Sequence, residues 1–552
     1  MFRRLPLVAL AALVAAVAPL AQAGKKTVCT ITVNSSDERE TFRRSLPPGD
    51  FDFVELVEHG RPDWLASACR KGVSCDVLLI SGHFDDGSEF YSDRPDTREH
   101  LPVDEMERVS CSDSCPGLFS QLKEVYLFGC NTLNADAVKF TSPEIERSLV
   151  RAGRSPAEAS QVARMLDAQH GESNRDRMRL IFKDVPVIYG FSSKAPLGPS
   201  AANVLDRWFQ GGGATEVASG RASPKLLTLF APVSMTATAG LVDADPQATH
   251  RGDVCRFADD RPSTATKVAF MHELLGRDAA EARMFLDRIE RQAGAARAAA
   301  PRSPDVEAAL AAIAGDTGAR ERYFALARDA DLLATRVRML EVARQVGWLA
   351  PADEPGTLVQ VIGEHVARSA VGPEDVDLAC RLNADGRLSD AARSLPVAPA
   401  QANRTGAAAV LACLGRIEHR ARVLRALTSS DDADVELAQV YLARRPIGDA
   451  VELRDVTLGI TQMNAATAQV RALDTLAGLR PADRESLDAL TRLFPRTRSL
   501  LVQRAIAGVL IRTDYQAIAS ADVVRALRQS RVKSPDGADL IDVLIRRLQA
   551  SS

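Results

Sequence analysis

The chain has 552 residues, with 69 lysines and arginines against 72 aspartates and glutamates and a net charge of −3. This length exceeds what one hydrophobic core supports and indicates about three or four domains. Aromatic residues make up 5% of the chain, and no basic block is interleaved with them. The composition therefore argues against a nucleic-acid partner.

The N-terminus has the pattern of a secretory signal. Two arginines precede an apolar run over residues 5–20, and a small-x-small triplet ending at Ala23 follows. This order predicts a Sec-type signal peptide over residues 1–23, cleaved near Ala23. A membrane anchor is the alternative, but the run is short for a span of about 20 residues and Pro19 interrupts its end. We therefore expect a bacterial protein that is periplasmic or secreted, with no membrane partner after cleavage.

Up to about residue 260, short apolar runs alternate with helical patterns. The runs expected to form strands are 28–33, 51–57, 77–81, 125–129 and 185–191, with a weaker pattern at 226–235. The helices expected between them are about 36–46, 60–71, 114–122, 142–168 and 200–209. Because the strands are continuously apolar, this alternation predicts βαβ units and a mostly parallel sheet flanked by helices.

From about residue 264 the strand patterns end, and alanine, leucine and arginine dominate. Residues 434–444 and 500–512 resemble alternate helices of HEAT-like repeats, which stack helix pairs and bind protein partners or substrates. A generic helical domain is the alternative, and residues 291–301 indicate a loose linker or helix end. The expected parts are a signal peptide at 1–23, an α/β domain at 24–260 and an α-helical HEAT-like repeat domain at 261–552.

The cysteines indicate both disulfides and one leftover thiol. The nine cysteines are Cys29, Cys69, Cys75, Cys111, Cys115, Cys130, Cys255, Cys380 and Cys413. An odd number in an oxidising compartment leaves one unpaired. Closeness in sequence favours the pairs Cys69–Cys75 and Cys111–Cys115. Cys380 and Cys413 both lie in the helical C-terminal part and could join two neighbouring helices, which leaves Cys29 with Cys255 and Cys130 alone. A zinc site is less favoured, because the CxxC pairs typical of structural zinc are missing from the sequence.

Two strand ends carry residues suited to nucleophilic catalysis. The strand at 77–81 is followed by Gly82 and His83, and the strand at 125–129 ends with Gly129 before Cys130. Adjacent parallel strands would bring His83 and Cys130 to the same edge of the sheet, where ligands bind in α/β folds. An imidazole beside a thiol stabilises the reactive thiolate and can donate a proton to a leaving group. The two glycines would let backbone N–H groups approach an oxyanion.

These two motifs resemble those of the caspase-like cysteine peptidases, a group that includes caspases, gingipains, clostripain, legumain, separase and bacterial CHAT domains. In that family a histidine closes one strand and a cysteine closes the next. Here Ser81-Gly82-His83 and Gly129-Cys130-Asn131-Thr132 stand 47 residues apart, near the spacing of about 50 in caspases. The resemblance covers about residues 27–240. It implies a proton-shuttle role for His83, a nucleophile role for Cys130 and an oxyanion contact from the Cys130 N–H.

The sequence departs from the family pattern at two positions. Phe84 follows the histidine where the family usually has glycine, and Phe128 stands where caspases carry glutamine and metacaspases aspartate. The resemblance therefore implies no preference for a charged substrate residue. Gly82, Phe84, Gly129 and Ser192 are the candidates for oxyanion or pocket contacts. For Ser192, on the segment that ends the fifth strand, an ordinary exit from the strand is the alternative.

The sequence thus predicts an exported cysteine endopeptidase acting on protein or peptide substrates through Cys130 and His83, with no cofactor. A metal site at His83, Asp85 and Asp86 is a weaker alternative because it needs a further ligand from elsewhere. The alternative of another class is a non-enzymatic helical-repeat scaffold that carries a degenerate caspase-like domain.

Overall fold

The computed structural model describes residues 24–61, 63–84, 87–94, 99–112, 115, 117–137, 141–534, 537 and 539–551. The expected signal peptide lies outside the described residues. The chain divides into two compact units, one formed by residues 1–142 and 161–263, the other by residues 143–160 and 264–552. Each unit is described by itself.

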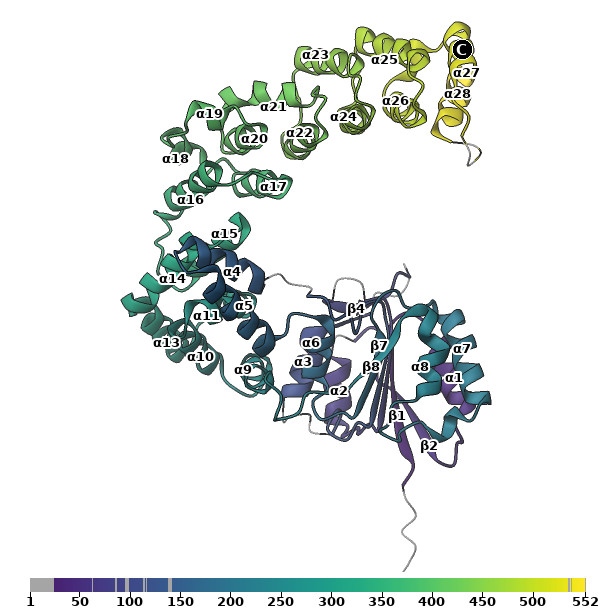
Figure 1. Cartoon of the computed structure of the whole chain (residues 1–552), viewed down its shortest axis with the longest axis vertical. Helices are drawn as coiled ribbons and strands as arrows, with labels where there is room; N and C mark the ends of the chain where they lie inside the picture. The colour runs from purple at the N-terminus through teal and green to yellow at the C-terminus, as the bar shows by residue number, and fades with distance from the viewer. Residues whose placement is uncertain are drawn as a thin grey trace, which may run out of the picture. The chain divides into compact units, whose positions relative to one another are not determined.

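The first unit is built on a six-stranded sheet whose spatial order is β2-β1-β3-β6-β7-β8. Its strands are β1 (Lys26–Thr32), β2 (Phe51–Glu55), β3 (Val77–Ser81), β6 (Glu124–Phe128), β7 (Val187–Phe191) and β8 (Met235–Thr238). All pairs are parallel except β7 with β8, so only this edge strand runs in the opposite direction. The predicted α/β class with a mostly parallel sheet is confirmed (Figure 1).

Helices cover both faces of this sheet (Figure 1). One face packs against α1 (Asp37–Ser45), α7 (Gly198–Gln210) and α8 (Pro224–Phe230), and the other against α2 (Trp64–Arg70), α3 (Val103–Cys111) and α6 (Asn174–Ile181). Side chains of β3 alternate between the two cores: Leu79 joins the α7 side and Ile80 the α3 side. Every residue of β3, β6 and β7 is buried, which explains why these runs are continuously apolar.

Some of the predicted elements are wrong. Residues 117–121 form turns in place of the helix expected at 114–122, and the structure has instead α3 followed by this turn. Ser223 caps α8 and Pro224 opens it, so 226–235 is mainly helix before β8 begins at Met235. The expected helix at 142–168 is split into α4 (Thr141–Arg151) and α5 (Pro156–His170), because Gly153 adopts a positive φ between them. A hairpin of β4 (Glu89–Tyr91) and β5 (His100–Pro102) was not predicted.

Four disulfides close the chain, and three of the predicted pairs are wrong. The pairs are Cys29–Cys75, Cys69–Cys115, Cys111–Cys255 and Cys380–Cys413, so only the last was predicted correctly. Cys29 lies within β1 beside β3, and Cys75 stands just before β3, so tertiary neighbours pair rather than sequence neighbours. Closing a loop of 46 residues stabilises the folded chain by about 4 kcal/mol in the loop-entropy account.

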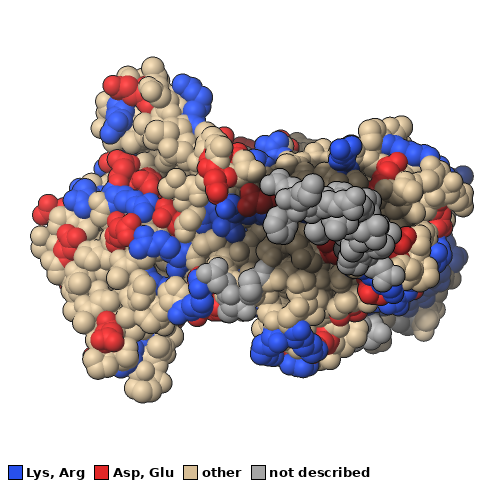
Figure 2. All heavy atoms as spheres, turned by 90° about the horizontal axis from the view of Figure 1, so that it is seen from below, with Lys and Arg blue, Asp and Glu red and all other residues tan. Residues whose placement is uncertain are grey.

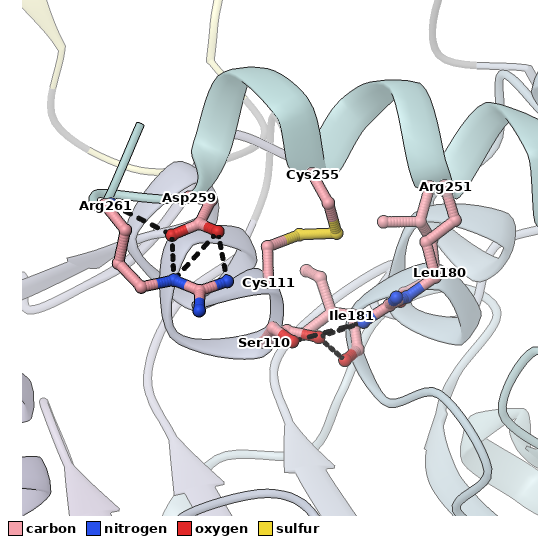
Figure 3. The surroundings of a disulfide bond; sticks show 8 residues. All are labelled: Ser110, Cys111, Leu180, Ile181, Arg251, Cys255, Asp259 and Arg261. Carbon is pink, nitrogen blue, oxygen red and sulfur yellow. Dashed lines mark hydrogen bonds and ion pairs between the residues drawn. A yellow bond between two sulfur atoms is a disulfide. The ribbon is translucent and has the colours of Figure 1, made fainter. Parts of the chain in front are cut away.

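The Cys111–Cys255 bond fastens α9 (Ala248–Ala258) to α3, and Figure 3 shows the polar contacts around it. Arg251 of α9 donates hydrogen bonds to the carbonyl oxygens of Leu180 and Ser110. Burial lowers the pKa of the Arg251 guanidinium, and these acceptors satisfy its donors. Disulfides in this number are typical of proteins that fold in an oxidising compartment.

The second unit is helical. Its helices after residue 263 are α10 (Thr264–Gly276), α11 (Ala279–Met284), α12 (Leu286–Ala298), α13 (Pro304–Gly315), α14 (Thr317–Asp329), α15 (Leu333–Gln345), α16 (Glu354–Arg368), α17 (Pro373–Leu382), α18 (Ser389–Arg393), α19 (Pro399–Ala402), α20 (Thr405–Cys413), α21 (Arg420–Ala426), α22 (Asp432–Arg444), α23 (Ala450–Thr461), α24 (Ala466–Leu479), α25 (Arg484–Arg496), α26 (Leu500–Arg512), α27 (Ala521–Ser530) and α28 (Leu540–Ser551). The predicted all-helical C-terminal part is confirmed. Residues 291–301, expected to be a linker or helix end, fall mainly within the second half of α12.

The last helices of this unit stack in two rows. Helices α17, α22, α24, α26 and α28 pack in succession, while α23, α25 and α27 pack beside them in a second row (Figure 1). Buried glutamines tie consecutive helices together: Gln469 donates to the carbonyl oxygen of Ile460, and Gln503 to that of Phe494. No described helix is long and apolar enough to cross a membrane.

Helix α4 lies in sequence between β6 and β7 but belongs to the helical unit. Its Glu144 forms a buried ion pair with Arg283 of α11 and accepts a hydrogen bond from the backbone N–H of Leu332. Asp331 pairs with Arg147 at 2.6 Å and with Arg151 on the next turn. Burial lowers the pKa of Arg283, and the Glu144 charge opposes that shift. Ion pairs therefore hold α4 against the other helices of the helical unit.

Acid should loosen α4 from the helical unit. Although partial burial acts in the opposite direction, Arg147 and Arg151 hold the pKa of Asp331 below its ordinary value. Such a carboxylate stabilises the fold above its unfolded pKa of about 4, and the contribution is lost as the pH falls through the lower folded value. We expect Asp331→Asn to cost about 1 kcal/mol at pH 7 and to remove the acid-dependent loss of hydrogen-exchange protection in α4. Asp305→Asn, at an exposed carboxylate, is the control; unchanged α4 protection in Asp331→Asn would contradict the interpretation.

Candidate active site

Cys130 is the one free cysteine among the described residues, as the odd count predicted. It stands two residues after the end of β6 and is half-buried. Its Sγ accepts a hydrogen bond from the backbone N–H of Ala195, with a sulfur–nitrogen distance of 3.3 Å. Ala195 lies in the loop that leaves β7. The thiol thus faces a backbone donor from the neighbouring strand's exit, and such a donor stabilises a negatively charged sulfur more than a neutral one.

His83 follows β3 and forms a short antiparallel bridge with Tyr91 of the β4–β5 hairpin. The two residues exchange backbone hydrogen bonds of 2.9 and 3.0 Å, and the imidazole ring lies 5.4 Å from the Tyr91 ring. Nε2 of His83 lies 3.3 Å from Oδ2 of Asp93. Asp93 is a candidate site residue that sequence reasoning missed. It lies in the loop after β4, and the pattern of that hairpin was not recognised.

The sheet brings His83 and Cys130 to the same edge. Ser81 and Phe128 are register partners on the parallel strands β3 and β6, so His83 and Cys130 each stand two residues beyond a paired position. Among the described residues, no hydrogen bond joins the imidazole to Sγ; Nε2 of His83 lies beside Asp93, and Sγ accepts from Ala195. Catalytic hydrogen bonds are often long or absent before substrate binds. The arrangement is an open pair at the carboxyl edge of the sheet.

The backbone N–H of Cys130 is available to a ligand. Within the described part of the chain, no group accepts a hydrogen bond from it, and the same holds for the N–H of Phe84. The N–H of Gly82 donates to the carbonyl oxygen of Phe128, and that of His83 donates to Tyr91. Cys130 therefore retains a donor that an oxyanion needs, whereas the N–H of Gly82 is already used and Phe84 is fully buried.

The two glycines are needed for close packing between strand ends. A Cβ on Gly129 would lie 2.8 Å from Cβ of Phe84 and 2.9 Å from the carbonyl oxygen of Gly82. A Cβ on Gly82 would lie 3.2 Å from Cβ of Val33. Real side chains do not approach backbone this closely, so Gly129 allows the chains that carry His83 and Cys130 to run side by side.

The remaining candidate residues occupy different environments. Phe84 is fully buried against Phe90, with ring centres 4.5 Å apart, so its side chain belongs to the core rather than to a pocket. Phe128 is also buried and packs against Phe191 and Phe230. Ser192 is exposed, and both its N–H and its hydroxyl donate to the carbonyl oxygen of Ser234.

Ionisable groups near this edge include a buried carboxyl. Glu38 of α1 accepts a hydrogen bond from Ser81 Oγ at 2.9 Å, and burial raises the pKa of Glu38. Asp85 and Asp86, which entered the metal alternative, lie outside the described residues. Among the residues that are described, no group of three or more histidine, cysteine, aspartate or glutamate side chains is placed to hold a metal ion. Figure 2 shows basic and acidic side chains interspersed over the face drawn.

Comparison with known proteins identifies no relative: no family model, no curated protein and no solved structure matches the chain.

Gly129→Ala tests the close approach of the two strand ends. The added methyl group would meet backbone and a Cβ below contact distance, so we expect a loss of about 1–3 kcal/mol in the free energy of unfolding. Urea unfolding measures this loss, and hydrogen exchange of the β3 and β6 amides shows whether it is local to these strands. Gly252→Ala in α9 is the control, since nothing lies within 4 Å of its Cβ position and a helical alanine gains up to about 1 kcal/mol. Equal stability of the Gly129 variant and the wild type would contradict the packing role.

Proposed function

We propose that the protein is an exported cysteine endopeptidase of the caspase-like type, with Cys130 as nucleophile and His83 as proton shuttle. The observation that supports this most is the environment of Cys130. It carries a free thiol at the carboxyl edge of a parallel sheet, beside the strand that ends in His83, and its own N–H has no acceptor among the described residues.

The chemistry follows from these groups. The Cys130 thiolate attacks the scissile carbonyl carbon, a C–S bond forms, and the carbonyl electron pair moves to oxygen. The N–H of Cys130 stabilises that oxyanion. Protonated His83 then donates its proton to the departing amine as the C–N bond breaks. In the second half, His83 accepts a proton from water, the hydroxide attacks the thioester, and the C–S bond breaks to release the carboxylic acid product and restore the Cys130 thiolate beside protonated His83.

Two neighbours refine this assignment. Asp93, 3.3 Å from Nε2 of His83, would hold the imidazole ring in place. Phe128, at the position where caspases and metacaspases carry polar residues, packs in an aromatic cluster. This position therefore offers a substrate no charged side chain, which supports cleavage without a preference for aspartate or a basic residue. Ser192 remains the candidate for contact with the substrate backbone.

The helical unit is proposed to bind a protein partner. Its two stacked rows of helices support a HEAT-like repeat that binds a protein substrate or a regulator. Export is supported by the four disulfides and by the N-terminal pattern that predicts a signal peptide cleaved near Ala23.

The second candidate function is a non-enzymatic scaffold. It is favoured by the lack of a hydrogen bond between the His83 imidazole and Cys130 Sγ among the described residues. In this case the helical rows bind a partner, and the α/β unit is a degenerate caspase-like domain.

Alkylation of Cys130 separates the two functions. We expect iodoacetamide at pH 7 to label Cys130 in the folded, oxidised protein, at a rate that falls about 10- to 100-fold in His83→Ala because the imidazolium no longer stabilises the thiolate. Mass spectrometry of the tryptic peptides identifies the labelled cysteine. His59→Ala removes an exposed histidine of the same unit and should not change the rate.

A peptide library then tests cleavage, with Cys130→Ala as the inactive reference. Two results together would leave only the scaffold function. Labelling of Cys130 would be the same with and without His83, and any cleavage seen with the wild type would persist in Cys130→Ala.

Asp93→Asn tests the orienting carboxylate. Asparagine keeps the shape of the side chain but replaces one carboxylate oxygen with an amide NH2, so the contact that holds the His83 ring is weakened. Since Asp93 is exposed, we expect a loss of about 3- to 10-fold in the His83-dependent alkylation rate, measured at low salt. Asp52→Asn, at an exposed carboxylate on β2, provides the comparison; an unchanged rate in Asp93→Asn would show that Asp93 has no role.

A further inference from the structure

The first residue of α6 lies between the two loops that carry the candidate dyad. Asn174 is buried, with 5% of its surface exposed. Its Nδ2 donates a hydrogen bond of 3.0 Å to the carbonyl oxygen of Asn131, the residue that follows Cys130. A buried side-chain amide thus contacts the backbone directly beside the nucleophile.

The same amide contacts the loop that follows His83. Gly87 approaches Asn174 so closely that a Cβ on Gly87 would lie 2.4 Å from Asn174 Oδ1. Gly87 has a φ of +77°, which favours glycine. One turn further along α6, Arg177 donates from Nη1 to the carbonyl oxygen of Gly87 at 3.1 Å and pairs with buried Glu107 of α3. The N-terminal turn of α6 therefore holds both loops.

The backbone that Asn174 contacts is strained. Asn131 has a φ of +59°, a conformation that costs a non-glycine residue about 1 kcal/mol or more. Its N–H donates to the carbonyl oxygen of Ser193 at 2.7 Å, and its own carbonyl accepts from both Asn174 and Asn134. These bonds fix the peptide on the carboxyl side of Cys130, and with it the direction of Sγ toward Ala195.

We propose that Asn174 is a positioning residue that holds Asn131, directly after Cys130, and Gly87, four residues after His83, in the arrangement that catalysis needs. This role rests on the proposed function. Asn174 does not touch the reacting atoms; it acts through the Asn131 carbonyl and through Gly87. Because it lies outside both strand-end motifs, it forms a third element of the site, contributed by the segment between β6 and β7.

The test compares variants that remove the amide with one that weakens α6 itself. Asn174→Asp keeps the shape but loses the Nδ2 donor, and Asn174→Ala removes the amide without adding charge. Ser173→Ala is the matched control, because the Ser173 side chain caps α6 by accepting from the Asp176 N–H and leaves the Asn174 amide in place. The readouts are the iodoacetamide rate at Cys130 from pH 5 to 9, thermal unfolding, and hydrogen exchange of the peptide that contains Asn131.

We expect both Asn174 variants to lower the His83-dependent alkylation rate by about 10- to 100-fold. They should also reduce the protection of the Asn131 peptide. Ser173→Ala should lower the unfolding temperature at least as much but change the rate by no more than about 3-fold. That separation supports positioning, since a merely structural role would move rate and unfolding temperature together.

Two results would overturn the proposal. If wild type and both Asn174 variants show the same His83-dependent rate, Asn174 has no positioning role although the proposed function stands. If rate and unfolding temperature fall in parallel in all three variants, Asn174 is only a structural residue. A wild-type chain without His83-dependent alkylation would instead overturn the proposed function, and this role with it.

Discussion

The site depends on the parallel pairing of β3 with β6. It also depends on Gly129, whose lack of a side chain lets the two strand ends lie close together. The register of these strands sets which residues emerge together at the carboxyl edge of the sheet. Because Gly129 has no side chain, the backbone just before Cys130 lies close to Gly82 and Phe84, the residues on either side of His83. The candidate chemistry is thus a consequence of how two buried strands end. The Asn174 side chain of α6 and the backbone N–H of Ala195 after β7 complete it.

The sequence was informative where one physical signal dominated. Continuous apolar runs predicted β3 with its exact bounds and β6 within one residue, because strands buried on both faces tolerate little else. Helical periodicity likewise predicted α26 with its exact bounds. The strand-end motifs put His83 and Cys130 at one edge of the sheet. Contacts between residues far apart in sequence could not be predicted: Asp93 beside His83, Asn174 beside Asn131, and three of the four disulfides.

The disulfides show why proximity in sequence is a poor guide to tertiary pairing. Cys69 and Cys75 are six residues apart in sequence. Cys69 lies in the last turn of α2 and bonds to Cys115, whereas Cys75 stands just before β3 and bonds to Cys29. Together the three bonds of the α/β unit link β1, α2, α3 and α9 to elements around them. Cys130 is left reduced because it stands at the carboxyl edge of the sheet, where its sulfur meets a backbone N–H rather than another thiol.

The path of the chain through α4 has a consequence for how the two units can be separated. Glu144, supplied from between β6 and β7, neutralises the buried guanidinium of Arg283 in the helical unit. A fragment beginning at residue 264 would lack α4, and with it Glu144 and Ser148, which contact the Arg283 guanidinium. The helical unit is therefore not encoded by one continuous segment of the chain. One of its helices, α4, is encoded within the α/β unit. A chimaera that contains the helical unit must therefore also include this segment of the α/β unit.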